Sequence, residues 1–257
     1  MSRLLSLAAG TVLDVTPCEI VEVAALAGFG AVGIWFDPTT WKRSDPPEIR
    51  TRLEHRNLIA LDIEPVMLTP TGDHGDAIID TAIEIGVRNI LVASREPDRG
   101  KVASRLAALA QRVEHTDIKL VLEFLPILAI KTLADALAIV ESVDHKSVGV
   151  LIDSLHLARS GSSRDLITEA NLTRFPYLQI CDAPASMLDP SPERLMHEAL
   201  HGRLLPGEGD LDLQGLLRQV PDVPLSFELR SEALRRNFPD PTTRARAVFR
   251  SAQTLIP

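Results

Sequence analysis

The sequence predicts an α/β fold, a single (β/α)₈ TIM barrel. Short apolar segments alternate with longer amphipathic segments along the 257 residues, and eight such pairs in about 250 residues match the size of this fold. The apolar segments are continuous rather than alternating, which is typical of parallel strands covered on both faces. A doubly wound sheet shares this rhythm, but no Gly-x-Gly-x-x-Gly follows the first strand, which excludes its usual nucleotide-binding form.

Strands and helices are expected in strict alternation. The expected strands cover residues 4–12, 31–36, 59–68, 89–93, 119–125, 148–157, 177–182 and 224–229. The expected helices cover residues 17–27, 46–55, 76–85, 99–113, 132–143, 164–169, 211–220 and 242–255. Over 132–143 the apolar residues recur mostly at three- and four-residue steps, the spacing of one buried stripe. Gly28 and Gly86 follow helical segments, as helix-ending glycines do.

Composition and charge restrict the class of protein. Apolar residues make up 45% and charged residues 24%, which excludes a disordered chain. The net charge of -8 argues against a nucleic-acid partner, because such binding depends on basic side chains. Asp14 interrupts the apolar start, and no apolar run is long enough to cross a membrane. Cys18 and Cys181 are too few for a disulfide framework. We therefore expect one domain over 1–257 in a soluble, cytoplasmic protein.

Polar side chains interrupt the last four expected strands. Glu123 lies inside an apolar run, Asp153 follows five apolar residues, Gln179 lies in the seventh strand and Glu228 in the eighth. Strand carboxyl ends converge on the active-site mouth of a barrel. Three carboxylates brought together there would repel each other, and a divalent cation reverses that penalty. An all-oxygen set favours Mg²⁺ or Mn²⁺ over Zn²⁺. These four residues are therefore the predicted metal ligands.

Further candidates surround the predicted metal site. His156, three residues after Asp153, is expected to face the ligand and donate to a substrate oxygen, or else to hold a backbone carbonyl. Arg203 precedes a Pro-Gly-Glu-Gly turn and has the geometry to bind a carbonyl, carboxylate or phosphate oxygen, although the turn also has a purely structural reading. Trp35 ends the second strand and is either a flat wall for a sugar ring or a filler of the barrel mouth.

Five short sequence segments around the candidate residues together resemble the xylose isomerase-like TIM barrels, the sugar phosphate isomerase/epimerase superfamily. The likeness rests on Leu-Glu-Phe-Leu-Pro around Glu123, Leu-Ile-Asp-Ser-Leu-His around Asp153 and Gln-Ile-Cys-Asp-Ala around Gln179. Leu-Leu-Pro-Gly-Glu-Gly after Arg203 and Phe-Glu-Leu around Glu228 complete it. The resemblance implies the same four metal ligands, with the two glutamates also moving the proton and with His156 and Arg203 binding substrate oxygens. It also suggests a homo-oligomer.

Two departures from the family pattern bear on the reaction. Many members carry His where this chain has Gln179, and ketose 3-epimerases carry a further Glu where this chain has Ala129. The second departure favours a dehydratase or isomerase acting on a polyol or keto-sugar over a strict ketose 3-epimerase.

The expected chemistry is proton removal from carbon next to a carbonyl, with Glu123 and Glu228 as the acid/base pair. We therefore expect a metal-dependent isomerase or epimerase acting on a sugar, keto-sugar or cyclic polyol. An inosose-type dehydratase and a non-catalytic sugar-binding barrel are the alternatives. A nuclease resembling endonuclease IV is disfavoured, because only His156 among the histidines lies at an expected strand end.

Overall fold

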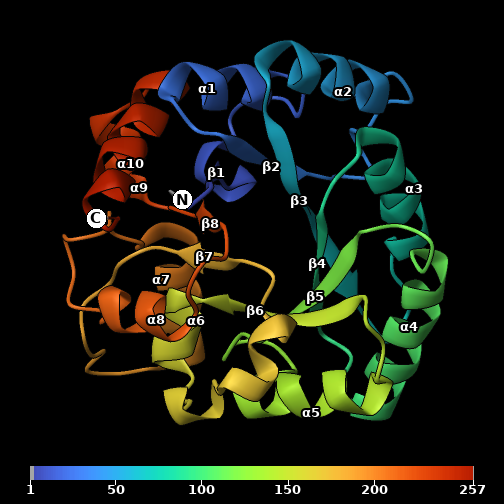
Figure 1. Ribbon diagram of the computed structural model, residues 1–257. Helices are drawn as coiled ribbons and strands as arrows, with labels where there is room; N and C mark the ends of the chain where they lie inside the picture. Colours follow the sequence, from blue (N-terminus) through green and yellow to red (C-terminus); the bar gives the residue numbers. More distant parts are fainter. Residues whose placement is uncertain (1–2, 257) are drawn as a thin grey trace.

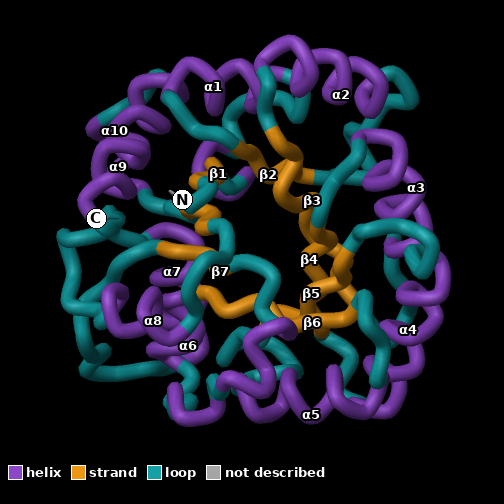
Figure 2. Tube along the Cα trace, viewed as in Figure 1, coloured by secondary structure: helices purple, strands orange, loops and turns teal. Residues whose placement is uncertain are grey.

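The computed structural model describes residues 3–256, and within this range the chain forms a closed barrel of eight parallel strands. Each strand pairs with the next one along the chain, and β8 closes the ring onto β1. The view in Figures 1 and 2 has the strands as an inner ring and the helices outside it. The predicted (β/α)₈ barrel is confirmed.

The strands begin where the sequence predicts them to within one residue and mostly end earlier. They are β1 Leu5–Leu7, β2 Ala31–Trp35, β3 Ile59–Leu68, β4 Asn89–Ser94, β5 Lys119–Glu123, β6 Val148–Asp153, β7 Leu178–Ile180 and β8 Leu225–Phe227. The helices are α1 Glu19–Ala27, α2 Asp45–Arg56, α3 Gly75–Ile85, α4 Arg99–Arg112, α5 Leu133–Val143, α6 Ser154–Arg159, α7 Pro192–His201, α8 Leu213–Gln219, α9 Glu232–Asn237 and α10 Pro241–Thr254.

Three expected segments are wrong in type. The first strand stops at Leu7, and the 3₁₀ helix η1 (Ala9–Val12) follows it. The sixth strand stops at Asp153, because the Asp153 carboxylate accepts from the backbone N–H groups of Leu155 and His156 and so caps α6. The segment 164–169 forms two 3₁₀ turns, η2 (Arg164–Leu166) and η3 (Glu169–Arg174), instead of one α-helix. Gly28 and Gly86 end α1 and α3 with a left-handed conformation, as predicted.

The inside of the barrel is layered along the strand direction. A small apolar cluster fills one layer, and it includes Val121, Leu151 and Tyr177. Two residues further along the same strands come Glu123, Asp153 and Gln179, and a spacing of two returns a side chain to the same face. The polar layer therefore lies on the apolar one, toward the carboxyl ends of the strands.

The larger apolar core is formed by buried residues of the outer helices together with buried residues of the strands. Across residues 3–256, none of the helices is long and apolar enough to span a bilayer.

An ion pair between a buried arginine and a solvent-accessible aspartate fastens the last helix to the start of the barrel. Arg244 on α10 is 2% exposed and donates to both carboxylate oxygens of Asp14, at 2.7 and 2.8 Å. Replacing Asp14 by Asn leaves this guanidinium without its charge partner, so we expect the free energy of unfolding to fall by about 2 kcal/mol. Urea unfolding at pH 7 measures this, with Glu54→Gln in the exposed Arg50–Glu54 pair as a control that costs under about 0.5 kcal/mol.

The same pair predicts a pH dependence. Hydrogen bonds from Arg244 lower the pKa of Asp14 in the folded protein. The pair therefore stabilises the fold at every pH above the unfolded pKa of an aspartate, and this stabilisation is lost as the pH falls through the lowered folded value. The stability difference between the native chain and Asp14→Asn should shrink between pH 5 and pH 2. A difference that stays constant over that range contradicts the assignment.

Candidate active site

The predicted ligands all lie buried at the carboxyl ends of neighbouring strands. Glu123 is the last residue of β5, Asp153 the last of β6, Gln179 lies on β7, and Glu228 directly follows β8. Asp153 and Gln179 are register partners, which puts their side chains on the same face of the barrel wall. The barrel thus brings together residues that are more than 100 positions apart in the sequence.

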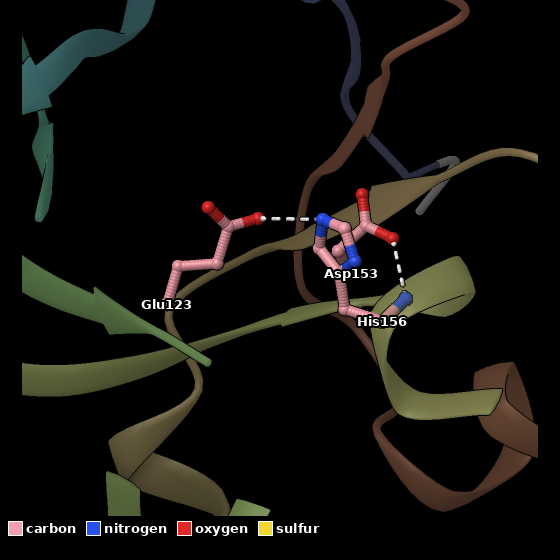
Figure 3. Close-up of side chains that lie close together, drawn as sticks. All are labelled: Glu123, Asp153 and His156. Atoms are coloured by element: carbon pink, nitrogen blue, oxygen red, sulfur yellow. Dashed lines mark hydrogen bonds and ion pairs between the residues drawn. The ribbon is translucent and has the colours of Figure 1, made fainter. Parts of the chain in front are cut away.

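Glu123, Asp153 and His156 form the tightest group (Figure 3). Each offers one potential ligand atom, and these atoms lie within 4.8 Å of one another. His156 Nε2 is 3.8 Å from Glu123 Oε1. Burial lowers the pKa of His156 to about 4, so its imidazole is neutral and has a lone pair to offer. His156, expected as a substrate contact, therefore lies as close to the two carboxylates as a metal ligand would.

The Asp153 carboxylate serves two local functions. Its Oδ1 accepts hydrogen bonds from the backbone N–H groups of Leu155 and His156, at 2.7 and 3.1 Å, which caps α6. Its Oδ2 lies 2.6 Å from a terminal nitrogen of Arg203. Burial would raise the pKa of Asp153, but the charge of Arg203 holds it below its usual value. Asp153 is thus an ionised carboxylate in a fixed orientation.

Arg203 links two of the predicted ligands. Besides Asp153, it contacts Oε2 of Glu228 at 2.9 Å, and its Nε donates to the carbonyl of Ala199 at 3.0 Å. The guanidinium is 3% exposed, so these contacts are made out of water. Arg203 was expected to bind substrate oxygens; in this structure its two terminal nitrogens contact the carboxylates of Asp153 and Glu228 and so join them.

Asp182 explains how the loop that carries Arg203 is fixed. Its carboxylate accepts from the backbone N–H groups of Ala183, Gly207 and Leu211, at 2.9, 2.9 and 3.1 Å. Gly207 has a φ of +90°, a conformation that glycine adopts without strain. The Pro-Gly-Glu-Gly turn is therefore a structural clamp that sets the position of Arg203.

Two buried carboxylates escaped the sequence analysis. Asp62 and Glu64 lie on β3, and Gln179 donates to Glu64 Oε2 at 3.4 Å. Both oxygens of Asp62, Oε1 of Glu64 and Oε1 of Gln179 are buried without a hydrogen-bond partner in the described part of the chain. Like Glu123, they are acidic residues inside an apolar strand, so the signal was present. It was overlooked because they lie in the middle of the strand and not at its end.

Negative charge accumulates in this polar layer. Burial and the charge of Glu228 raise the pKa of Asp62 to about 7. Burial, followed by the charge of Glu228, also raises the pKa of Glu64, and burial followed by the charge of Asp153 raises that of Glu123. A divalent cation relieves such mutual repulsion, and the unpartnered Gln179 oxygen is a neutral ligand available to it. The donor set therefore fits a divalent metal.

The aromatic candidate Trp35 stands at the end of β2, half-buried. The guanidinium carbon of Arg230 lies 5.8 Å from the centre of its ring. On its outer side, Trp35 lines a cavity of about 820 Å³ between the start of α1 and the segment joining β2 to α2. Glu123, Asp153, Gln179 and Glu228 do not line this cavity.

Glycine at position 10 is required by the approach of Glu228. A Cβ built on Gly10 would overlap the Glu228 carboxylate. Gly10→Ala should therefore push this carboxylate away from Arg203 and lower the free energy of unfolding by about 1–3 kcal/mol. A double-mutant cycle with Glu228→Ala measures the coupling by urea unfolding. We expect the cost of Gly10→Ala to disappear once the carboxylate is removed; an equal cost in both backgrounds would show that Glu228 is not the obstacle.

Comparison with known proteins identifies relatives over most of the chain. The sequence model of a family described as xylose isomerase-like TIM barrel matches residues 21–252. A 3-dehydroshikimate dehydratase of Pseudomonas putida is 22% identical over 236 residues, covering 84% of this chain and 36% of that protein. The enzyme of the same name from Pseudomonas aeruginosa is 26% identical over 248 residues, covering 90% of this chain and 38% of that protein. The chain thus spans little more than a third of these relatives.

Solved structures with the same barrel include two of similar length. The IOLI protein with a bound zinc atom superposes with a TM-score of 0.79 at 17% identity, covering 99% of this chain and 98% of that one. A D-allulose 3-epimerase from Methylomonas sp. in complex with D-allulose superposes with a TM-score of 0.67 at 16% identity, covering 99% and 98%. At these identities the likeness establishes the fold.

Proposed function

Because the chain belongs to the xylose isomerase-like TIM barrel family, we propose that it is a divalent-metal-dependent enzyme that removes a proton next to a carbonyl and eliminates water. The substrate would be a β-hydroxy carbonyl compound, such as a keto-sugar or cyclic polyhydroxy ketone. The two curated relatives named as dehydratases support elimination as the net reaction. The predicted isomerase or epimerase becomes the second candidate.

The observation that carries this proposal is the unequal setting of the two glutamates. Glu228 is tied by its Oε2 to Arg203 at 2.9 Å. Glu123 has no lysine or arginine within 4.0 Å among residues 3–256, and its ion-pair partner is the neutral His156 at 3.8 Å. Of these two glutamates, Glu123 is therefore the free base. One base is sufficient for elimination, whereas inversion at carbon by two bases needs a free group on each side of the substrate.

The proposed metal ligands are Glu123, Asp153, Gln179 and Glu228, with His156 near enough to be a fifth. Glu123 and Asp153 belong to the tight group, and Gln179 has an unpartnered amide oxygen. A bound divalent ion would supply Lewis acidity toward the substrate carbonyl, which makes the neighbouring C–H bond more acidic. We propose Mg²⁺ or Mn²⁺ for the four oxygen ligands; coordination by the imidazole of His156 would shift the preference toward Zn²⁺.

The chain's own side chains account for the proton movements. Glu123 takes the proton from the carbon, the released electron pair forms the C=C bond, and the C–O bond to the β-hydroxyl breaks. The proton held by Glu123 then passes to the departing oxygen, directly or through His156 beside it, and water leaves. Arg203 contacts Glu228 at 2.9 Å and so holds the orientation of that carboxylate.

Epimerisation remains the second candidate because both glutamates lie at the barrel mouth and the D-allulose 3-epimerase shares the fold. A panel distinguishes the two reactions: 3-dehydroshikimate, an inosose and a ketohexose, each incubated in D₂O with Mn²⁺. We expect water loss from a panel member, seen as absorption of the unsaturated product, and we expect EDTA to stop it. Deuterium incorporation with inversion and no water loss would support the epimerase, and turnover unchanged by EDTA would contradict metal dependence.

A further inference from the structure

Arg230 occupies a position that the proposed reaction does not use. It follows Glu228 by two residues, a spacing that returns a side chain to the same side of an extended chain. Its carbonyl accepts a hydrogen bond from the backbone N–H of Arg203 at 3.3 Å, so this segment is attached to the loop that carries Arg203. Arg230 is therefore anchored at the barrel mouth beside the carboxylate layer.

The guanidinium of Arg230 is held without using its hydrogen-bond donors. It lies over the Trp35 ring, 5.8 Å from the centroid, a cation–π arrangement. Its side chain makes no hydrogen bond and has no carboxylate within 4.0 Å anywhere in residues 3–256. By contrast Arg203, Arg159 and Arg244 each bind a carboxylate at 2.6–2.9 Å.

The surroundings determine which anion would fit. Both terminal nitrogens of Arg203 contact Asp153 and Glu228, whereas the Arg230 guanidinium makes no ion pair within residues 3–256 and its N–H groups are available to a ligand. The cavity beyond Trp35 is lined by charges of both signs, among them Asp14, Asp37, Lys42 and Arg52. A single guanidinium with one face on an indole presents its N–H edge, which matches a planar carboxylate in a bidentate contact.

We infer that Arg230, held over Trp35, binds a carboxylate group of the substrate and so selects anionic over neutral polyhydroxy carbonyl compounds. This inference rests on the proposed function for the reacting centre and adds the substrate class. It also gives Trp35 a different function from a sugar-stacking wall: the indole orients the guanidinium. Arg230 is then a specificity-determining residue that acts through binding and takes no part in proton transfer.

Binding of two matched probes tests the inference without catalysis. Shikimate is a cyclic trihydroxy carboxylate, and shikimamide is its neutral amide. Isothermal titration of the Mn²⁺-loaded protein should give about tenfold to hundredfold tighter binding of shikimate, the range expected for a charge-assisted contact. Arg230→Gln should abolish this preference, and Arg230→Lys should restore only part of it, because an ammonium lacks the fork. Arg236→Gln, at an exposed position on α9, should leave it intact.

The outcomes separate this inference from the proposed function. An equal preference for shikimate in the native chain and Arg230→Gln overturns the inference, as does a native chain that shows no preference or binds neither probe. A preference for shikimate that depends on Arg230 supports the inference. If it is found without water loss from any candidate substrate, it contradicts the proposed dehydration. Thermal unfolding of each variant confirms that the fold is retained, which we expect because the Arg230 side chain makes no hydrogen bond within residues 3–256.

Discussion

Glu123→Gln should lower kcat by about 10²- to 10⁴-fold, the usual contribution of a positioned general base. The amide is nearly the same size as the carboxylate but has no basic oxygen to accept the proton. Because Glu123 makes no ion pair with an arginine or lysine among residues 3–256, its loss leaves no buried cation unpaired. We therefore expect the free energy of unfolding to change little or to rise, since one of several mutually repelling carboxylates is removed.

Steady-state kinetics on whichever substrate loses water measures this effect. Glu141→Gln on the exposed face of α5 is the matched control and should keep the native rate. Mn²⁺ binding, followed in parallel, separates a missing base from a missing ligand. A Glu123→Gln enzyme that still binds Mn²⁺ and turns over within threefold of the native rate would show that Glu123 is not the base.

Arg203→Met should have the largest effect on stability. The substitution leaves Asp153 and Glu228 buried without their cation. Removing one partner of a buried ion pair typically lowers the free energy of unfolding by about 3–5 kcal/mol. The methionine fills part of the space but cannot donate to the Ala199 carbonyl. Urea unfolding without metal measures the loss, with Arg218→Met on the exposed side of α8 as a control expected to cost under about 0.5 kcal/mol.

Added Mn²⁺ gives this prediction a second readout. A bound cation would neutralise the two stranded carboxylates, so Mn²⁺ should raise the unfolding temperature of Arg203→Met more than that of the native chain. A loss below about 1 kcal/mol without metal would contradict the assignment of Arg203 as the cation that stabilises these two carboxylates. Equal Mn²⁺ shifts in both proteins would mean that the ion binds elsewhere.

The sequence was sufficient for the barrel because its evidence is repeated eight times. Each β-strand is a continuous apolar run, and helix-ending glycines such as Gly28 confirm the boundaries between units. The errors lie where a side chain overrides the apolar pattern. Leu155 and Leu157 are as apolar as strand residues, but the Asp153 carboxylate binds the N–H groups that follow it and starts a helix.

Part of the site could be predicted because a polar residue inside an apolar strand segment can be recognised from the sequence alone. Four polar residues break the apolar pattern of their strands: Glu123, Asp153, Gln179 and Glu228. The structure buries all four at one end of the barrel. The sequence did not predict which of these polar side chains contact one another. The Arg203 bridge and the contact of Gln179 with Glu64 depend on the closure of the ring, which sets residues 50 to 115 positions apart side by side.

The proposed function depends on the binding of one divalent ion by the carboxylates at the barrel mouth. Titration of the purified chain with Mn²⁺, with free ion counted by electron paramagnetic resonance, tests this most directly. We predict one tightly bound ion per chain, lost in Asp153→Asn and retained in Asp182→Asn, whose carboxylate serves only the loop clamp. A native chain that binds no Mn²⁺, or one whose binding survives Asp153→Asn unchanged, would contradict it.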